Sequence, residues 1–345
     1  MKGIQQDRLE AYFTEHVEGA EPPLRFNLIT GGRSNLTYLV EDARGVKRVL
    51  RRPPTGAVLV TAHDMEREHR IMSGLADTDV PVPRILALCQ DESVNDAPFY
   101  VMEYVEGDVL VTPEMTGKRV PEANRHALGM NIIEVLAHLH RIEPDDVGLG
   151  KLGRRDAYLT RQLKRWKTQW EKSKTRELPT MDEAHALLEA RMPEQVSTAI
   201  VHGDFRMGNF LTNGAKGRIE AVLDWELCTL GDPLADVGYL MNDWNGPNDE
   251  RPTASGTGLS ATSCGGFPSR TEILARYEEL TGFSTKDVDY FRAFQYWRLA
   301  AIVEGVLSRY KKGVMGDAAD TGAFESQTAA LASAALDLIR SDDLG

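Results

Sequence analysis

Short apolar runs separated by turn residues fill the first third of the chain and predict a small antiparallel sheet. Runs of this length, bounded by glycine, proline or charged residues, are typical of strands joined by turns. The predicted strands cover residues 26–30, 36–40, 46–51, 85–89 and 99–104. Helical spacing of apolar residues predicts two helices beside these strands, at 7–18 and 63–75.

Beyond Pro121 the apolar residues recur every three to four positions, which predicts helices. One such stripe, ending near His140, comprises Leu128, Ile132, Val135, Leu136 and Leu139. Further helices are predicted at 158–171, 270–280, 286–310 and 323–339. Residues 245–269 are rich in Gly, Pro, Ser and Thr, and we predict a loop too polar for the core, of the kind that often serves as a lid or a binding segment.

The change from strand pattern to helix pattern marks a boundary between two lobes. It falls at 102–107, where an apolar strand runs into acidic residues and glycine, as expected of a connector. We therefore predict an α+β fold with a small antiparallel-sheet lobe at residues 1–104 and a larger, mainly helical lobe at 105–345. The backbone at Glu103 and Val105 could read an adenine edge, although a plain strand end explains these residues equally well.

Composition narrows the choice of partners and compartment. The net charge of −12 repels polyanions, so we expect neither nucleic acid nor an anionic membrane as the main partner. Three widely spaced cysteines allow neither a disulfide framework nor a zinc ribbon, and they fit a reducing cytosol. The N-terminus lacks an apolar stretch of signal-peptide length, and no run approaches about 18 apolar residues. We therefore expect a cytoplasmic protein; the sequence indicates no oligomeric state.

One stretch, from 201 to 225, carries most of the candidate chemistry. It places His202, Asp204 and Asn209 in one tight loop and brings Asp224 in at the end of an apolar run that predicts a buried strand. Phosphoryl transfer to a hydroxyl uses one carboxylate to accept the proton, and a second carboxylate with an amide to hold magnesium. A His-Gly-Asp turn alone has an equally good structural explanation, in which Asp caps the loop. The added spacing to Asn209 and Asp224 favours a kinase.

Two segments of the small lobe are candidates for nucleotide contacts. The turn Gly31-Gly32-Arg33-Ser34-Asn35 joins two predicted strands, and Gly32 would let the backbone approach phosphates while Ser34 and Asn35 add donors. Taken alone, such a turn more often just closes a hairpin.

The end of the third predicted strand holds Arg51, at the place where a kinase carries a phosphate-binding cation paired with a glutamate on the next helix. Glu66 and Glu68 are both available on that helix, and we favour Glu68 because it leans toward the apolar side. A solvent-exposed basic pair at a strand end is the alternative for Arg51, and a solvated face is the alternative for Glu68.

Two further features of the larger lobe bear on substrate and positioning. The predicted helix at 158–171 carries a basic cluster off its apolar face, a candidate seat for an anionic substrate tail, although such a run is more often simply solvated. The cluster comprises Arg161, Lys164, Arg165 and Lys167. Asp236, in the first turn of a predicted helix, could reach back to the N–H groups of the catalytic loop and hold Asp204 in place.

Several motifs together resemble the aminoglycoside phosphotransferase and choline kinase superfamily, which has a protein-kinase-like fold. Within it they resemble the branch found as the kinase domain of acyl-CoA dehydrogenase family members 10 and 11. The motifs are Gly-Gly-Arg-Ser-Asn-Leu-Thr (31–37), Val-Leu-Arg-Arg-Pro-Pro (49–54), Arg-Glu-His (67–69), Tyr-Leu-x-Arg-Gln-x-x-Arg-Trp (158–166) and the block at 201–238.

This resemblance implies roles for individual residues. Asp204 would be the catalytic base, Asn209 and Asp224 the Mg²⁺ ligands, and Glu68 the partner of the strand-end cation. Arg51 departs from the lysine that the superfamily carries at this position.

The expected activity is an ATP- and Mg²⁺-dependent transfer of the γ-phosphoryl group to a hydroxyl of a small molecule. The basic cluster and the resemblance favour a hydroxyacyl-CoA or a related metabolite as acceptor. Two alternatives stay open at this point: an aminoglycoside O-phosphotransferase, and a catalytically inactive pseudokinase that binds a ligand or partner.

Overall fold

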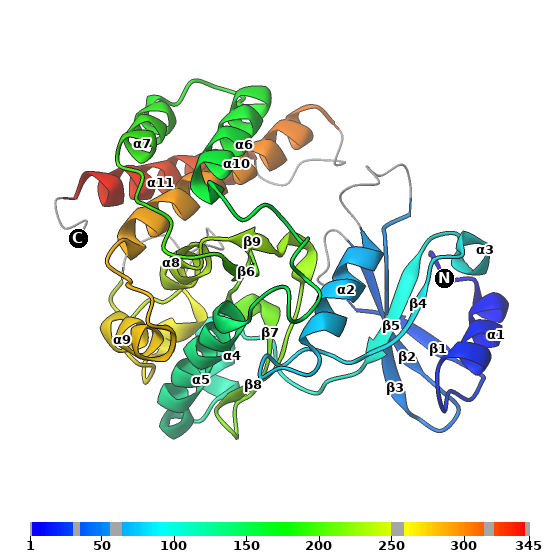
Figure 1. The fold of residues 1–345 in the computed structure, drawn as a ribbon. Coiled ribbons are helices and arrows are strands. Elements are labelled where there is room, and N and C mark those ends of the chain that lie inside the picture. The colour runs from blue at the N-terminus through cyan, green and yellow to red at the C-terminus, as the bar shows by residue number, and fades with distance from the viewer. Residues whose placement is uncertain (1, 30–34, 56–63, 250–258, 314–320, 342–345) are drawn as a thin grey trace.

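The computed structural model describes residues 2–29, 35–55, 64–249, 259–313 and 321–341. A small lobe built on an antiparallel sheet stands beside a larger, mostly helical lobe, so the predicted α+β fold is confirmed (Figure 1). None of the helices in these residues combines the length and the apolar character needed to cross a lipid bilayer.

The small lobe contains five antiparallel strands in the order β1-β2-β3-β5-β4. They are β1 (Arg25–Leu28), β2 (Leu36–Glu41), β3 (Lys47–Arg52), β4 (Ile85–Cys89) and β5 (Phe99–Glu103). Helix α1 (Gln6–His16) packs on one face and α2 (Met65–Leu75) on the other, and the short α3 (Glu92–Asn95) lies beside α1 (Figure 1). Each strand predicted from the sequence is present.

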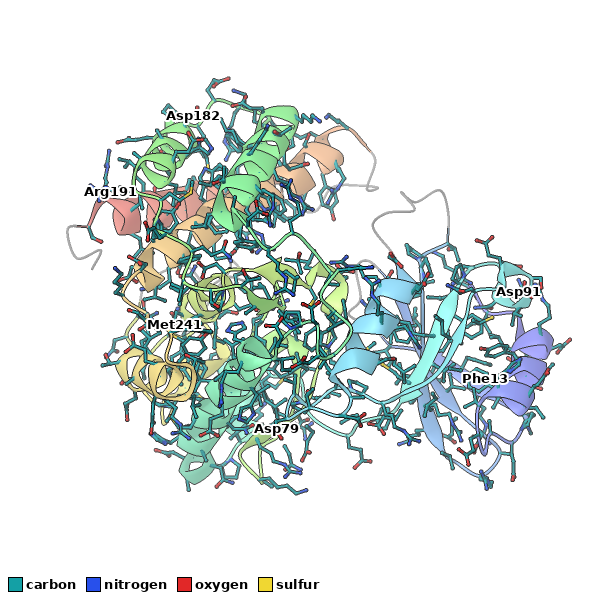
Figure 2. The ribbon with its side chains drawn as sticks, in the orientation of Figure 1. Phe13, Asp79, Asp91, Asp182, Arg191 and Met241 are labelled. Carbon is teal, nitrogen blue, oxygen red and sulfur yellow. The ribbon has the colours of Figure 1, made fainter. Side chains whose placement is uncertain are left out.

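Alternation along the strands divides the apolar residues of the sheet between two cores. Successive side chains of a strand point to opposite faces, so Val49 and Leu50 belong to different clusters. On the α1 side, Leu50 and Val101 pack with Phe13, which Figure 2 places between that helix and the sheet. On the α2 side, Val49 joins residues of the larger lobe in one continuous cluster.

The larger lobe surrounds one long central helix, α10 (Val288–Lys311), which packs against α6, α7, α8 and α11. The other helices are α4 (Pro113–Arg119), α5 (Glu122–Arg141), α6 (Tyr158–Ser173), α7 (Pro179–Ala190), α8 (Leu234–Asn242), α9 (Arg270–Thr281) and α11 (Thr321–Arg340). The sequence analysis missed α4 and α7. Both begin with a proline, whose fixed φ suits the first turn of a helix.

Two short ladders near the small lobe position the candidate catalytic residues (Figure 1). Strand β6 (Ala199–Val201) pairs with β9 (Thr229–Gly231), and β7 (Phe210–Asn213) pairs with β8 (Arg218–Val222). The loop after β6 ends in a 3₁₀ turn, η2 (Met207–Asn209), and β8 leads into a second, η3 (Trp225–Leu227).

The prediction that 245–269 is too polar for the core is wrong for its described end. Residues 260–263 are buried, and η4 (Ala261–Cys264) packs against α4. Their hydroxyls satisfy one another, because Ser260 Oγ lies 2.8 Å from Thr262 Oγ1, which donates to the carbonyl of Asn245 at 2.9 Å. Paired polar groups can therefore enter a core that their composition alone excludes.

Candidate active site

The loop after β6 is held from below by a buried carboxylate. The backbone N–H groups of His202 and Gly203 donate to the two oxygens of Asp236, at 2.6 and 2.8 Å, and Asp236 is fully buried in the first turn of α8. This confirms the reach of Asp236 that was predicted from the sequence. Gly203 has a φ of +85°, and a Cβ there would lie 2.9 Å from the carbonyl oxygen of Leu227, so the turn requires glycine.

Asp204 and Asn209 meet at the top of this loop. The Nδ2 of Asn209 donates to Asp204 twice, to Oδ2 at 2.7 Å and to the carbonyl at 2.8 Å. The amide nitrogen is thereby used, which leaves Oδ1 of Asn209 as an acceptor for a cation. The Nε of Arg206 lies 3.3 Å from Oδ1 of Asp204, whose side chain keeps 21% of its surface exposed. Asp204 is thus fixed in place and open to a ligand.

Asp224 follows the end of β8 and lies beside Asp204 and Asn209. The N–H of Leu223 donates to the carbonyl of Asn209 at 2.8 Å, and the buried ring of His202 lies 3.0 Å from the carbonyl of Leu223. Asp224 follows directly, in the left-handed region with a φ of +66°. A non-glycine residue in this region is costly and is often found at functional sites. The three predicted residues Asp204, Asn209 and Asp224 therefore converge.

Arg51 connects this group to the small lobe. Its Nε lies 3.0 Å from Oε2 of Glu68, and one of its terminal nitrogens lies 2.7 Å from Oδ1 of Asp224. The predicted Arg51–Glu68 pair is confirmed, whereas Glu66 accepts a hydrogen bond from Gln90. Glu226 of η3, which the sequence analysis did not single out, lies 3.9 Å from the same guanidinium.

Of the three carboxylates around Arg51, Glu68 is the most enclosed, with 2% of its side chain exposed. It accepts from Asn35 Nδ2 and from the hydroxyl of Tyr100, each at 2.9 Å. Burial raises the pKa of Glu68, and the charge of Arg51 offsets this only in part. Asn35, predicted as a donor to phosphates, thus contacts Glu68 here, while Gly32 and Ser34 lie outside the described residues.

The two predicted adenine-edge residues lie at the end of β5. The N–H of Glu103 donates to the carbonyl of Arg84 at 2.9 Å, and its side chain accepts from the N–H of Arg84 at 3.0 Å. Glu103 thereby holds the start of β4. Val105 is half-buried just beyond the strand.

The donor set fits magnesium. Oδ1 of Asn209 and the carboxylate of Asp224 are hard oxygen ligands, and Mg²⁺ is usually bound by one or two carboxylates together with substrate phosphates and water. Among the described residues, no group of three or more His, Cys, Asp or Glu could form an all-protein metal site. Asn209 and Asp224 could supply two of the oxygen ligands of a magnesium ion.

Arg298 is another residue of the site that escaped the sequence analysis. Arg298, from the middle of α10, donates from both terminal nitrogens to the carbonyl of Gly203, each at 3.2 Å. No local motif marks it, because its partner lies 95 positions away in the sequence.

Comparison with known proteins places these features in a family. The phosphotransferase enzyme family matches residues 25–265. Mouse acyl-CoA dehydrogenase family member 10 is 35% identical over 328 residues, covering 94% of this chain and 30% of the mouse protein. Human family member 11 is 31% identical over 313 residues, covering 88% of this chain and 39% of the human protein. The chain thus spans less than half the length of either relative.

Solved structures show the same fold. A Ralstonia eutropha protein, provisionally described as an aminoglycoside phosphotransferase, is 33% identical with a TM-score of 0.81, over 97% of this chain and 98% of that one. An aminoglycoside phosphotransferase solved with AMP-PNP and hygromycin B is 16% identical with a TM-score of 0.57, over 97% and 98% of the two chains. The predicted kinase-like fold is confirmed, and the chain belongs to the phosphotransferase enzyme family.

Proposed function

We propose that this protein transfers the γ-phosphoryl group of ATP to a hydroxyl of a small-molecule acceptor. The observation that carries the proposal is the convergence of Asp204, Asn209 and Asp224, from two separate ladders, beneath a cation of the small lobe. Asp204 is placed to accept the acceptor's proton. Magnesium, held by Asn209 and Asp224, would neutralise the charge of the phosphates when bound.

In this proposal, Arg51 is the cation that binds the phosphates of ATP. A guanidinium presents a planar fork of donors and stays charged at any pH of interest, so it can hold Glu68 through Nε while its terminal nitrogens meet other anions. The terminal nitrogen of Arg51 that lies 2.7 Å from Oδ1 of Asp224 would also donate to an oxygen of a bound phosphate group.

For the acceptor, we favour a hydroxyacyl thioester of the acyl-CoA class. The relatives at 31–35% identity are named as acyl-CoA dehydrogenase family members, and the matching segment is only part of each relative. A kinase segment joined to an acyl-CoA enzyme would act on a related metabolite. An aminoglycoside acceptor, suggested by the descriptions of the solved neighbours, is the competing candidate.

The test is the variant Asp204→Asn, assayed for ADP release with ATP and Mg²⁺ across a panel of hydroxylated acceptors. Loss of the proton acceptor should lower kcat by about 10²-fold or more and leave the affinity for ATP close to that of the unmodified protein. Asp146→Asn, an exposed carboxylate in the loop after α5, makes the same chemical change away from the site and should keep full turnover.

Two outcomes would contradict the proposal. Turnover retained by Asp204→Asn would remove the assigned base. ATP binding by the unmodified protein with no ADP release on any acceptor would identify a pseudokinase instead.

A further inference from the structure

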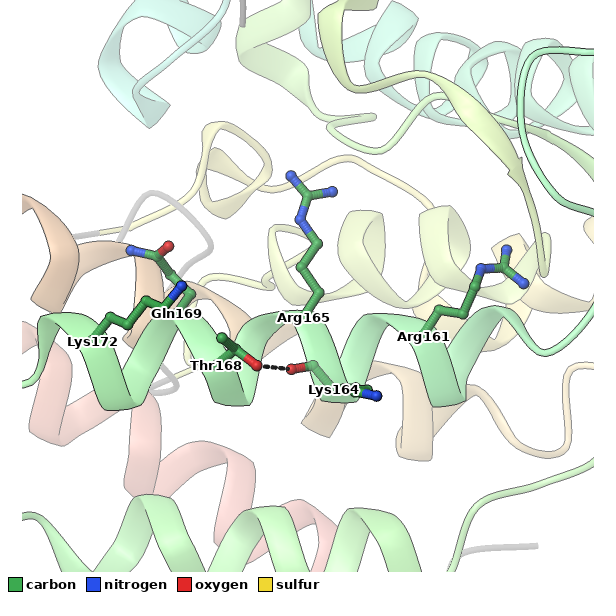
Figure 3. Close-up of a pocket in the computed structure, with 6 residues that line it drawn as sticks. All are labelled: Arg161, Lys164, Arg165, Thr168, Gln169 and Lys172. Carbon is green, nitrogen blue, oxygen red and sulfur yellow. Dashed lines mark hydrogen bonds between the residues drawn. The ribbon is translucent and has the colours of Figure 1, made fainter. Parts of the chain in front are cut away.

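One face of α6 forms a pocket whose charged lining is entirely positive. The pocket has a volume of about 470 Å³ and is lined by Arg161, Lys164, Arg165, Thr168, Gln169 and Lys172. These residues form two parallel rows with a spacing of four, so each row follows one side of the helix. Figure 3 shows Arg161, Arg165 and Gln169 extending from the same side of α6.

Three of the four cations have no counter-charge within the described ranges. Lys164, Arg165 and Lys172 are exposed, and no carboxylate of those ranges lies within ion-pair distance of them. The fourth cation, Arg161, has a weak ion pair, because its Nη1 lies as far as 3.9 Å from Oδ1 of Asp156. The same Nη1 is buried and has no hydrogen-bond partner. The chain has a net charge of −12, so carboxylates that could pair with these cations are abundant. Cations that nevertheless stay unpaired in one pocket indicate a site for an anionic ligand.

The other lysines of the same segment behave differently. Lys167, which the sequence analysis grouped with this cluster, lies 3.0 Å from Glu171 and also pairs with Asp182 of α7. Lys174, just past the end of the helix, lies within 3.3 Å of both Glu171 and Glu177. Positive charge is therefore neutralised outside the pocket and left unneutralised inside it.

A chain of contacts links the pocket to the candidate catalytic loop. The guanidinium of Arg165 lies 5.3 Å from the ring centre of Trp166, and Arg298 of α10 lies 5.4 Å from the same ring. Arg298 in turn donates to the carbonyl of Gly203 at 3.2 Å, next to Asp204. One aromatic ring and one arginine thus separate the pocket lining from the residue that precedes the proposed base.

We propose that this pocket binds a phosphate-bearing part of the acceptor, remote from the hydroxyl that is phosphorylated. The proposal rests on the function proposed above. Guanidinium groups match phosphate oxygens with paired hydrogen bonds, and lysines add charge without demanding one geometry. A volume of about 470 Å³ leaves room for part of a small molecule, and the net charge of the chain disfavours a nucleic acid as the ligand.

The test measures binding of coenzyme A by calorimetry while ADP and Mg²⁺ saturate the nucleotide site. The double variant Lys164→Gln/Lys172→Gln should raise the dissociation constant about tenfold or more, because two charge-assisted contacts are lost. The control Lys167→Gln/Lys174→Gln removes the same charge from the same helix region, and the dissociation constant should stay unchanged. Pantetheine, which lacks phosphates, should not distinguish the two double variants.

Equal dissociation constants for coenzyme A in the two double variants would overturn the proposal. Binding of inorganic pyrophosphate without binding of coenzyme A would also overturn it, since the pocket would then serve a free anion and not an acceptor. ATP titrated into the unmodified protein separates this result from the proposed function. If ATP binding and turnover are normal but the two double variants bind coenzyme A equally well, only the pocket proposal is wrong. If the unmodified protein does not bind ATP, the kinase proposal is wrong.

Discussion

At the scale of single residues, Arg51 connects the two lobes at the candidate active site. One guanidinium joins a buried glutamate of the small lobe to Asp224 of the larger lobe, with 13% of its own side chain exposed. A lysine ammonium is a point charge that lacks the fixed fork of the guanidinium, so it could not hold both carboxylates in this geometry. An arginine at this position therefore allows one side chain to contact carboxylates of both lobes.

We predict that Arg51→Met lowers the free energy of unfolding by about 3 kcal/mol, because Glu68 is left buried without its cation. Adding Glu68→Gln should recover about 1 kcal/mol or more, since the variants of a contacting pair are not additive. Urea unfolding of the two single variants and the double variant measures the coupling. Arg25→Met serves as control: Arg25 pairs with Glu41 from an exposed position, and its loss should cost less than about 1 kcal/mol. Strict additivity of Arg51→Met and Glu68→Gln would contradict the coupling.

The residues that the sequence could reveal are those whose spacing is local. Asp204 and Asn209 share one loop, and Asp224 closes the next hairpin, so the order of residues along the chain already encodes their convergence. Two arginines went unnoticed: Arg206, which belongs to this loop and lies 3.3 Å from Asp204, and Arg298, which contacts the loop from α10. Arg298 in particular is fixed by how α10 packs, which no short motif records.

At the scale of elements, α8 supports the catalytic loop through its first turn. Asp236 satisfies two loop N–H groups at once, and its other neighbour, His140 of α5, lies 3.4 Å away. Just before the helix, Asp232 accepts from the N–H groups of Leu234 and Val196. Two buried carboxylates thus organise the backbone on either side of β6.

We predict that Asp236→Asn lowers kcat about tenfold or more and leaves the KM for ATP nearly unchanged. The amide offers one acceptor oxygen, so one loop N–H loses its partner and the loop that carries Asp204 shifts, while the proposed nucleotide contacts of the small lobe are untouched. Steady-state kinetics separates the two constants. A rise in KM with an unchanged kcat would contradict a positioning role. Asp182→Asn, an exposed carboxylate on α7, is the matched control.

The second carboxylate predicts a pH dependence of stability. Burial raises the pKa of Asp232 from 3.8 to about 6, despite the two N–H donors. The folded protein therefore binds this proton more tightly than the unfolded chain, and the stability from this group is fully present below about pH 4 and lost as the pH rises through 6. The loss amounts to at most about 3 kcal/mol.

Urea unfolding between pH 4 and pH 7 tests this sign. The free energy of unfolding of the unmodified protein, minus that of Asp232→Asn, should fall as the pH rises across this range. Subtracting the variant removes the contributions of all other titrating groups. A constant difference would show that the two N–H donors cancel the effect of burial, and a difference that grows with pH would show that they outweigh it.

Elements were predictable from the sequence wherever their apolar pattern was strong. The strands of the sheet and the long helices α5, α10 and α11 appear close to their predicted bounds. Helix α7 was missed because it is only 12 residues long, so its apolar stripe repeats over few turns; its packing against α11 becomes visible only in three dimensions. The buried turn at 260–263 was missed because composition cannot show that hydroxyls will pair with one another.

At the scale of the whole molecule, the two lobes share a core on one side of the sheet. Met72 and Leu75 of α2 belong to the same apolar cluster as the helices of the larger lobe, whereas α1 closes a separate cluster on the opposite face. Polar contacts reinforce the junction, since Arg67 of α2 donates to the backbone carbonyls of Leu152 and Cys228. The sheet is therefore anchored to the larger lobe through α2.

This shared core predicts that both lobes unfold together. All five tryptophans lie beyond residue 104, so their fluorescence reports the larger lobe, and hydrogen exchange of the β2 and β3 amides reports the sheet. We expect the two probes to give the same midpoint in urea. Met72→Ala, which empties a buried position of α2, should cost about 2–5 kcal/mol and lower both midpoints by the same amount. If only the midpoint of the sheet moved, the lobes would unfold as independent units, and the shared apolar cluster would not couple them.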